Sequence, residues 1–423
     1  MDYEIKKANT LNVKLLLIAI ITTFFVLERL IVEHISFAGY FDELFTILCC
    51  GTSIYVAFCQ NQKFTRSEMV ALIFTVLVIV IGLMGNVISG LMNNPFLIIV
   101  DIISTVKIII AYYWIIGFKM PKEDWDEAIR LLAKWMRAFV IIMFIVWVLA
   151  YAMDLGILGE VRHGIKSYSF IMSSPGNYSK LFYFIVPLLT ADLMYGNTLY
   201  KKIIIAIALV LWAFSLRSRA IAFAVCYVAF AFWFFYMKDK RVKKINVLYL
   251  MPIAVVGLVL GWEQLVFYFT TDTQARSMLL RYSIVTMKDY FPLGSGFGTY
   301  GSDIAKTHYS VLYEKYGFLD VYGIGKVHTD YLNDNYWPMI IGQFGVIGTV
   351  LVVGVLFLLY KRMINAVIKN KYLYFSTLCM MGFLVVSSIA SKSYSEFSMI
   401  PVFLLHGIFV QREKSNSDFY LKE

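Results

Sequence analysis

The sequence predicts an all-α polytopic membrane protein with about 12 transmembrane helices and one large extracytoplasmic loop that contains short helices. Hydrophobic residues make up 60% of the chain and charged residues only 16%, whereas soluble domains carry about 25% charged residues. The apolar residues also fall in blocks of about 20, the length that a helix needs to cross roughly 30 Å of hydrocarbon. We therefore expect most of the chain to be surrounded by lipid.

Twelve apolar blocks are long enough to be candidate membrane spans. They cover 12–32, 41–59, 69–92, 96–118, 136–158, 180–196, 202–216, 220–237, 246–262, 336–360, 372–390 and 396–411. These blocks divide the chain into a bundle of nine helices (1–262), the extracytoplasmic loop (263–335), three further helices (336–411) and a tail (412–423). No small-residue cleavage site follows the first block, so we expect it to stay attached.

The basic residues predict the orientation of these spans. Lys and Arg gather in alternate connections, which the positive-inside rule places in the cytoplasm together with both termini. This pattern explains the net charge of +10, so nucleic acid is not an expected partner. The basic runs 201–202 and 238–244 both belong inside, so the chain must cross twice between them. Arg217 and Arg219 then lie at the outer surface.

The segment 119–137 has the pattern of an amphipathic helix. Trp125, Ile129 and Leu132 recur at helical spacing with charged residues between them. We expect this helix to lie along the inner leaflet, ahead of the next span.

The sequence predicts neither a metal site nor a cofactor. The five cysteines all lie in apolar blocks, which argues against a disulfide framework or a zinc cluster; they are Cys49, Cys50, Cys59, Cys226 and Cys379. His308 and His328 are 20 residues apart, without a ligand pair at helical spacing.

Arg217 and Arg219 oppose the general trend, because they put positive charge at the outer end of a helix hairpin. One explanation is that the two side chains reach the outer lipid headgroups. The other is an anion clamp, because the guanidinium fork matches phosphate oxygens better than an ammonium group does.

Other charges lie inside or beside the predicted spans. Arg29 and Glu33 are four residues apart near an outer helix end, where we expect them to pair. Lys107 is deeper, and two explanations stay open for it. It binds a lipid phosphate, or it pairs with a carboxylate such as Asp101 or Asp192.

The long loop opens with Glu263 and continues into a helical pattern from Asp272, a candidate N-cap, to Tyr290. Arg276 and Arg281 lie on this predicted helix. Together with the arginines of the hairpin they would make a strongly positive outer site. An ordinary solvated helix face explains them equally well.

Three alternating glycines follow this helix in the loop: Gly294, Gly296 and Gly298. Such a turn can bring backbone N–H groups close to an anion. A dinucleotide fingerprint would need a preceding strand and a soluble βαβ unit, and the sequence predicts neither.

The end of the loop concentrates acid–base groups just before a membrane helix. His328, Asp330, Asp334 and Asn335 lie within eight residues of one another, beside aromatic residues typical of a membrane interface. A base in this stretch could activate a hydroxyl group.

In this layout the chain resembles the bacterial O-antigen and capsular polysaccharide polymerases (Wzy type), which are related to the O-antigen ligases. The resemblance covers nearly the whole chain in the order of its spans and its large outer loop. At residue level it is carried by short motifs: 215–219 (SLRSR), Arg281, 292–300 (PLGSGFGTY), 334–336 (DNY) and 342–348 (GQFGVIG). Each motif is degenerate, and their order and placement carry the specificity.

The resemblance implies glycosyl transfer without a metal between undecaprenyl-diphosphate-linked oligosaccharides, at the outer face of the bacterial plasma membrane. It implies that Arg217, Arg219 and Arg281 hold the donor diphosphate and stabilise its charge as it leaves. Arg276 and the glycine turn, which the positive charge and the flexible backbone already suggest as an anion site, are further candidates for binding the diphosphate. A base near the end of the loop would deprotonate the acceptor. Ligases carry a His-Asn pair where this chain has Asp334-Asn335, so we favour Asp334 over His328. Asp330, Asn335 and Glu263 are further candidates.

Membrane lipid and a chain-length regulator protein are further candidate partners under this resemblance. Two other functions stay open. A ligase of the same class would transfer finished glycan to another acceptor. A flippase or transporter of lipid-linked oligosaccharide would fit the number of helices, although the sequence shows no related halves of the kind that transporters usually have.

Overall fold

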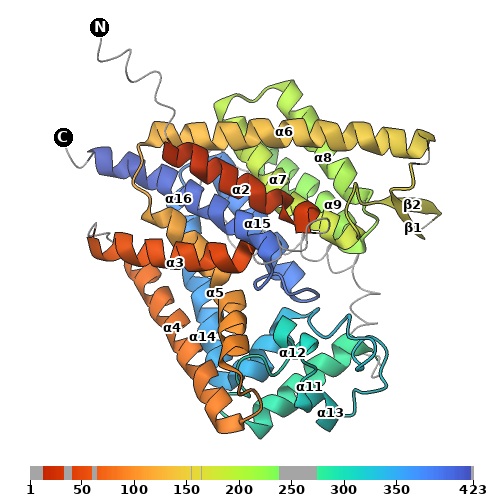
Figure 1. Cartoon of the computed structure of the whole chain (residues 1–423). Helices are drawn as coiled ribbons and strands as arrows, with labels where there is room; N and C mark the ends of the chain where they lie inside the picture. The colour runs from red at the N-terminus through yellow and green to blue at the C-terminus, as the bar shows by residue number, and fades with distance from the viewer. Residues whose placement is uncertain are drawn as a thin grey trace.

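The computed structural model describes residues 13–32, 41–59, 64–153, 155–162, 164–237 and 274–420, and most of them are helical (Figure 1). Within these described residues, six helices are long and apolar enough to cross a membrane. They are α4 (Arg66–Ser89), α5 (Pro95–Gly117), α6 (Lys122–Met153), α9 (Ser218–Phe232) with its π-helical continuation η3 (Trp233–Met237), α14 (Tyr336–Val367) and α15 (Lys371–Ser388). The fold agrees with a predominantly helical membrane protein.

Five further predicted spans are also helices. They are α2 (Val13–Val32), α3 (Phe41–Cys59), α7 (Pro175–Ala191), α8 (Leu199–Ala213) and α16 (Ile400–Tyr420), with the short 3₁₀ helices η2 (Asp192–Tyr195) and η5 (Phe397–Met399). The predicted tail therefore begins as a continuation of α16. The predicted span 246–262 lies outside the described residues, so twelve crossings remain a prediction.

The prediction for 119–158 needs two corrections. α6 is one continuous helix, because no glycine or proline interrupts 122–153. Trp125, Ile129 and Leu132 are fully buried against protein rather than exposed to lipid, and α6 packs against α2 and α16. The chain then forms an antiparallel hairpin of β1 (Leu158–Arg162) and β2 (Ile165–Tyr168), which the all-α prediction did not include.

Several ion pairs join segments that lie on the same predicted side of the membrane. In the predicted cytoplasmic set, Arg362 pairs with Glu68 at 2.9 Å, Arg412 with Asp126 at 2.8 Å, and Lys201 and Arg137 with Asp192. We call these pairs the inner network. On the predicted outer side, Lys180 pairs with Glu396, Arg276 with Asp334 and Lys392 with Asp303. Which set faces the cytoplasm remains a prediction.

Residues 274–335 form a lobe with its own hydrophobic core. The lobe contains α11 (Ala275–Asp289), α12 (Asp303–Thr307) and α13 (Val311–Lys315), and α11 covers most of the helix predicted over 272–290. Leu279, Tyr300 and Tyr313 lie at the centre of its core. The lobe lies at the end of the bundle where α4 finishes and α14 begins (Figure 1).

Candidate functional site

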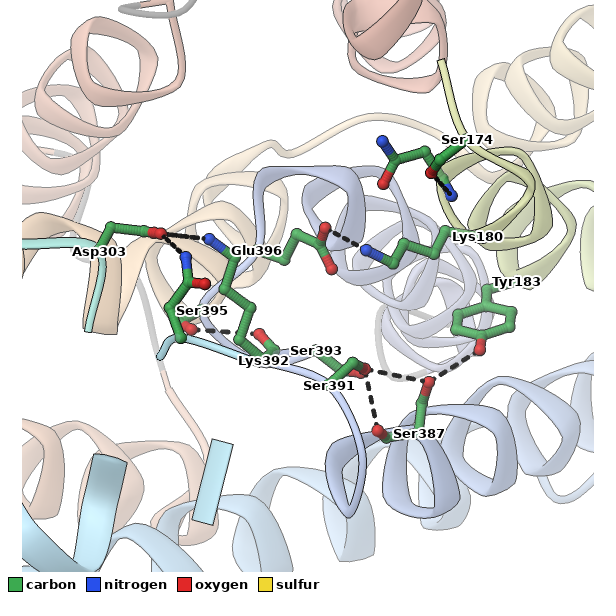
Figure 2. A network of polar contacts seen from close by, with 12 residues as sticks. Ser174, Lys180, Tyr183, Asp303, Ser387, Ser391, Lys392, Ser393, Ser395 and Glu396 are labelled. Atoms are coloured by element: carbon green, nitrogen blue, oxygen red, sulfur yellow. Dashed lines mark hydrogen bonds and ion pairs between the residues drawn. The ribbon is translucent and has the colours of Figure 1, made fainter. Parts of the chain in front are cut away.

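Charged side chains from four parts of the chain meet where the lobe contacts the bundle. Figure 2 shows four of these side chains, Lys180, Asp303, Lys392 and Glu396. We call this region the cationic seam and define it as Lys180, Arg219 and Lys392 with the carboxylates of Asp303 and Glu396. Lys180 lies on α7, Arg219 on α9, and Asp303 is the first residue of α12. Lys392 and Glu396 come from the connection between α15 and η5.

Lys392 links the bundle to the lobe through Asp303. Its Nζ lies 2.5 Å from Oδ1 and 2.7 Å from Oδ2 of that carboxylate, and the side-chain amide of Asn333 donates to Oδ1 as well. Burial alone would raise the pKa of the Asp303 carboxyl. The charge and hydrogen bonds of Lys392, with the bond from Asn333, outweigh burial and lower this pKa to about 2. Asp303 is therefore ionised and is an anchor rather than a base.

Lys180 lies near the start of α7. Ser174 caps this helix by accepting from the backbone N–H of Asn177, and Pro175 occupies the first turn. The Lys180 ammonium donates to Oε1 of Glu396, and the two side chains are only 15% and 7% exposed. Burial of two charges has a high desolvation cost, which close pairing offsets.

Arg219 is the second residue of α9, after a tight turn in which Leu216 adopts a left-handed conformation (φ 50°). Its Nη1 lies 3.4 Å from the carbonyl oxygen of Ser387 and 3.4 Å from Oγ of Ser391. No carboxylate among the described residues forms an ion pair with it. A helix N-terminus favours a nearby negative charge, so Arg219 and the start of α9 both favour an anion here.

Hydroxyl groups surround these cations. Ser391 donates to the Ser387 carbonyl at 2.9 Å and shares a 2.7 Å hydrogen bond with Ser393, while the Ser387 hydroxyl contacts that of Tyr183 at 2.8 Å. The Ser395 backbone N–H donates to the Lys392 carbonyl at 2.8 Å. All of these residues except Lys392 are buried. The turn is therefore internally bonded and holds the backbone of Lys392 in place.

The lobe side of the seam opens into a pocket of about 560 Å³. We call it the lobe pocket and define it by its lining residues, which are Asp303, Lys306, Thr307, Tyr309, Lys326, Thr329 and Asn333. Asp303 lines the pocket and pairs with Lys392, and Asn333 lines the pocket and donates to Asp303. The pocket and the cationic seam are thus neighbours.

The predicted catalytic residues at the end of the loop occupy different surroundings. Asp334 pairs with Arg276 through one oxygen at 2.9 Å, and it directly follows Asn333, which contacts the seam. His328 is exposed, with its ring centroid 5.6 Å from that of Tyr322. The structure therefore brings Arg276 and Asp334 together and leaves His328 on the lobe surface.

The other predicted site residues are also spread out. Arg281 and Asp330 are exposed, and Asn335 is buried at the N-cap of α14. Arg217 is half-buried at the N-cap of α9, next to the seam in sequence. Glu263 lies outside the described residues, as does the predicted N-cap Asp272.

The glycine turn packs against two helices, and its N–H groups are used inside the protein. Gly294 donates to the Tyr290 carbonyl at 2.9 Å, Gly296 to the Gln343 carbonyl at 2.9 Å, and Gly298 to Oδ2 of Asp101 at 2.7 Å. These donors are not available to a phosphate. The predicted role of these glycines in binding the diphosphate has no support in this geometry, and we leave them out of the site.

The glycines are explained by close packing instead. A Cβ atom on Gly296 (φ 90°) would lie 2.3 Å from the backbone nitrogen of Asn86 in α4. One on Gly294 would lie 2.4 Å from the backbone nitrogen of Gly345, where α14 is kinked (φ 59°, ψ −157°). The two glycine motifs of the resemblance, 292–300 and 342–348, are therefore one packing unit.

Sequence reasoning did not single out Lys180, Lys392, Asp303 or Glu396. Lys392 carried the same signal as the hairpin arginines, a basic residue in a short connection predicted to lie outside. Lys107 pairs with Asp42 at 2.7 Å, so neither predicted carboxylate is its ion-pair partner. Glu33, the expected partner of Arg29, lies outside the described residues, so the predicted Arg29–Glu33 pair stays a prediction.

A scan of protein-family models and a search of curated proteins each gave no match to this chain.

Proposed function

We propose that the chain is a polysaccharide polymerase, a metal-independent membrane glycosyltransferase. It would transfer a glycan from a polyprenyl-diphosphate donor onto a lipid-linked repeat unit at the outer face of the bacterial plasma membrane. One observation carries the proposal. Lys180, Arg219 and Lys392 come from separate parts of the chain and converge where the lobe meets an apolar helix bundle.

The substrate of such an enzyme has two unlike ends. Its polyprenyl tail requires hydrocarbon, and its diphosphate requires cations and hydrogen-bond donors at the depth of the headgroups. The exposed apolar surface of helices such as α4 and α9 suits the tail. The cationic seam suits the diphosphate, because Arg219 contacts only neutral oxygens among the described residues.

In the proposed reaction, a hydroxyl oxygen of one saccharide attacks the anomeric carbon of the other. The bond from that carbon to the diphosphate oxygen breaks, and its electron pair leaves with the diphosphate. Arg219 and Lys392 stabilise the charge that develops there. Asp334 is the proposed base that receives the hydroxyl proton; it lies closer in sequence to the seam contacts than the exposed His328 does.

Reconstitution into liposomes tests the proposal directly. The substrate is the lipid-linked saccharide that accumulates in source cells lacking the chain, and the products are separated by length. We expect a ladder of longer lipid-linked saccharides, formed without added metal and in the presence of a chelator. No extension by folded, reconstituted protein would overturn the proposal.

Observations in cells that lack the chain and in the liposomes distinguish the alternatives. A ligase would leave long lipid-linked polymer, not single repeat units, in cells that lack it. A transporter would move labelled lipid-linked saccharide across the bilayer without forming a glycosidic bond. Either outcome would replace the polymerase proposal.

A further inference from the structure

The proposed glycosyl transfer takes place at the seam and does not by itself require the size, polarity and charge of the lobe pocket. We infer that it is the binding site for the saccharide part of the acceptor, and that this saccharide carries an acidic group, a carboxylate or a phosphate. The inference rests on the proposed function, because that function supplies the saccharide. It adds where the sugar binds and what charge it bears.

The size and polarity of the pocket fit a short saccharide. Its volume of about 560 Å³ lies within the usual range for ligand sites. Its lining consists of hydroxyl, amide, ammonium and carboxylate groups with one aromatic ring. A saccharide offers hydroxyl groups around each ring, and these can bond to such a lining. An apolar ligand would leave the same groups unpaired.

Tyr309 provides a fixed aromatic wall. Its backbone has φ 33°, in a region that a bulky residue rarely adopts. Its hydroxyl donates to the carbonyl of Ile324 at 3.2 Å, and its ring packs edge-on against Tyr313 with centroids 5.4 Å apart. A ring held in this way can receive the C–H face of a sugar, because that face is apolar.

The charges of the pocket favour an acidic ligand. Two lysines and one carboxylate line it, and Lys392 already neutralises that carboxylate, Asp303. Lys326 pairs with Glu314 at 3.1 Å and lies 5.9 Å from the centroid of the Tyr309 ring. Among the described residues, the Lys306 ammonium bonds to a backbone carbonyl, that of Asp330, at 3.5 Å and to no carboxylate. The lining therefore keeps about one unmatched positive charge, which one acidic group would balance.

The position of the pocket indicates that this saccharide is the acceptor. Asp303 and Asn333 form part of its wall and also contact the seam, where the donor diphosphate is proposed to bind. A saccharide in the pocket would lie beside the leaving group. Asp334, the proposed base, directly follows Asn333.

Two measurements test this inference, namely the charge of the saccharide that accumulates in cells lacking the chain and the affinity of that saccharide for the protein. The saccharide is released from its lipid, applied to an anion exchanger, and titrated onto the purified full chain. A second sample is titrated after its acidic groups have been reduced or removed. We expect retention on the exchanger and about tenfold tighter binding by the untreated saccharide.

Lysine variants assign the effect to the pocket. Lys306→Ala should weaken binding of the untreated saccharide about fivefold and leave the neutralised form unchanged. Lys326→Ala is a second variant with the same expectation. Lys315→Ala is the matched control, because Lys315 is an exposed lobe lysine that pairs with Asp289 at 2.8 Å and does not line the pocket. Thermal unfolding is compared for all three to confirm that they are folded.

Three results would overturn the inference, namely a neutral saccharide, equal binding of the two forms, or equal effects of Lys306→Ala and Lys315→Ala. Each leaves the proposed function standing if the liposomes still extend the saccharide. If no lipid-linked saccharide accumulates, the proposed function and the inference both fail. The two failures are therefore distinguishable.

Discussion

The inner network and the cationic seam both consist of basic and acidic side chains. They differ in whether every basic side chain has a carboxylate partner. In the inner network, Glu68 holds Arg362, Asp126 holds Arg412, and Asp192 holds two cations. In the seam, Lys180 and Lys392 each have a carboxylate, but Arg219 contacts only serine oxygens among the described residues. The inner network therefore has the character of structural pairing. The seam keeps a cation that can receive an external anion.

The comparison predicts that removal of a cation from the inner network mainly affects stability. Arg362→Ala would leave Glu68, whose side chain is 1% exposed, without its ion-pair partner. We expect the free energy of unfolding to fall by about 4 kcal/mol. Thermal or denaturant unfolding in detergent measures the loss.

A double variant sharpens this test. Glu68→Gln with Arg362→Met removes both charges, so it should recover part of the stability that Arg362→Ala loses. A double variant that is as unstable as the single one would mean that the charge left behind is not the cause.

The next largest effect is expected where the lobe meets the bundle. Gly296→Ala would place a Cβ 2.3 Å from a backbone nitrogen of α4, in addition to the strain of φ 90°. Gly317→Ala is a control, because Gly317 has φ 73° but no atom within 4 Å of its would-be Cβ. We expect the control to lose about 1 kcal/mol of stability and Gly296→Ala about 3 kcal/mol more. Equal losses in unfolding measurements would show that the turn does not pack as described.

The smallest effect concerns the Asp303–Lys392 link and depends on pH. The pKa of Asp303 is lowered to about 2 in the folded chain, from about 3.9 when unfolded. Its stabilising contribution is therefore complete above about pH 4 and is lost as the pH falls through 2. Because the Asp303 side chain is 47% exposed, screening limits the contribution to about 1 kcal/mol.

Unfolding of the parent chain and of Asp303→Asn between pH 2 and pH 6 checks this expectation. The parent should be more stable by about 1 kcal/mol at pH 6, and the difference should shrink toward pH 2. A difference that does not change with pH would contradict the ion-pair explanation.

Hydropathy and charge predicted most helices because they depend on local sequence. The same reasoning placed Arg219 at a polar site, since a charge in a short hairpin is visible in the sequence. It missed the Asp303–Lys392 link because these residues are 89 positions apart and only the tertiary fold joins them. It assigned the glycine turn to anion binding because a backbone that comes close to a phosphate and a backbone that comes close to a helix both require glycine. The contacts of the turn with 342–345 show that close packing explains these glycines.

The unmatched charge of Arg219 is the central claim, and turnover in liposomes tests it most directly. Arg219→Ala should lower the rate of saccharide extension about 100-fold, with Arg219→Lys in between. Arg412→Ala, which removes a paired arginine of the inner network, should stay within about threefold of the parent once folded protein is matched. Full activity of Arg219→Ala, or equal losses in Arg219→Ala and Arg412→Ala, would contradict the account.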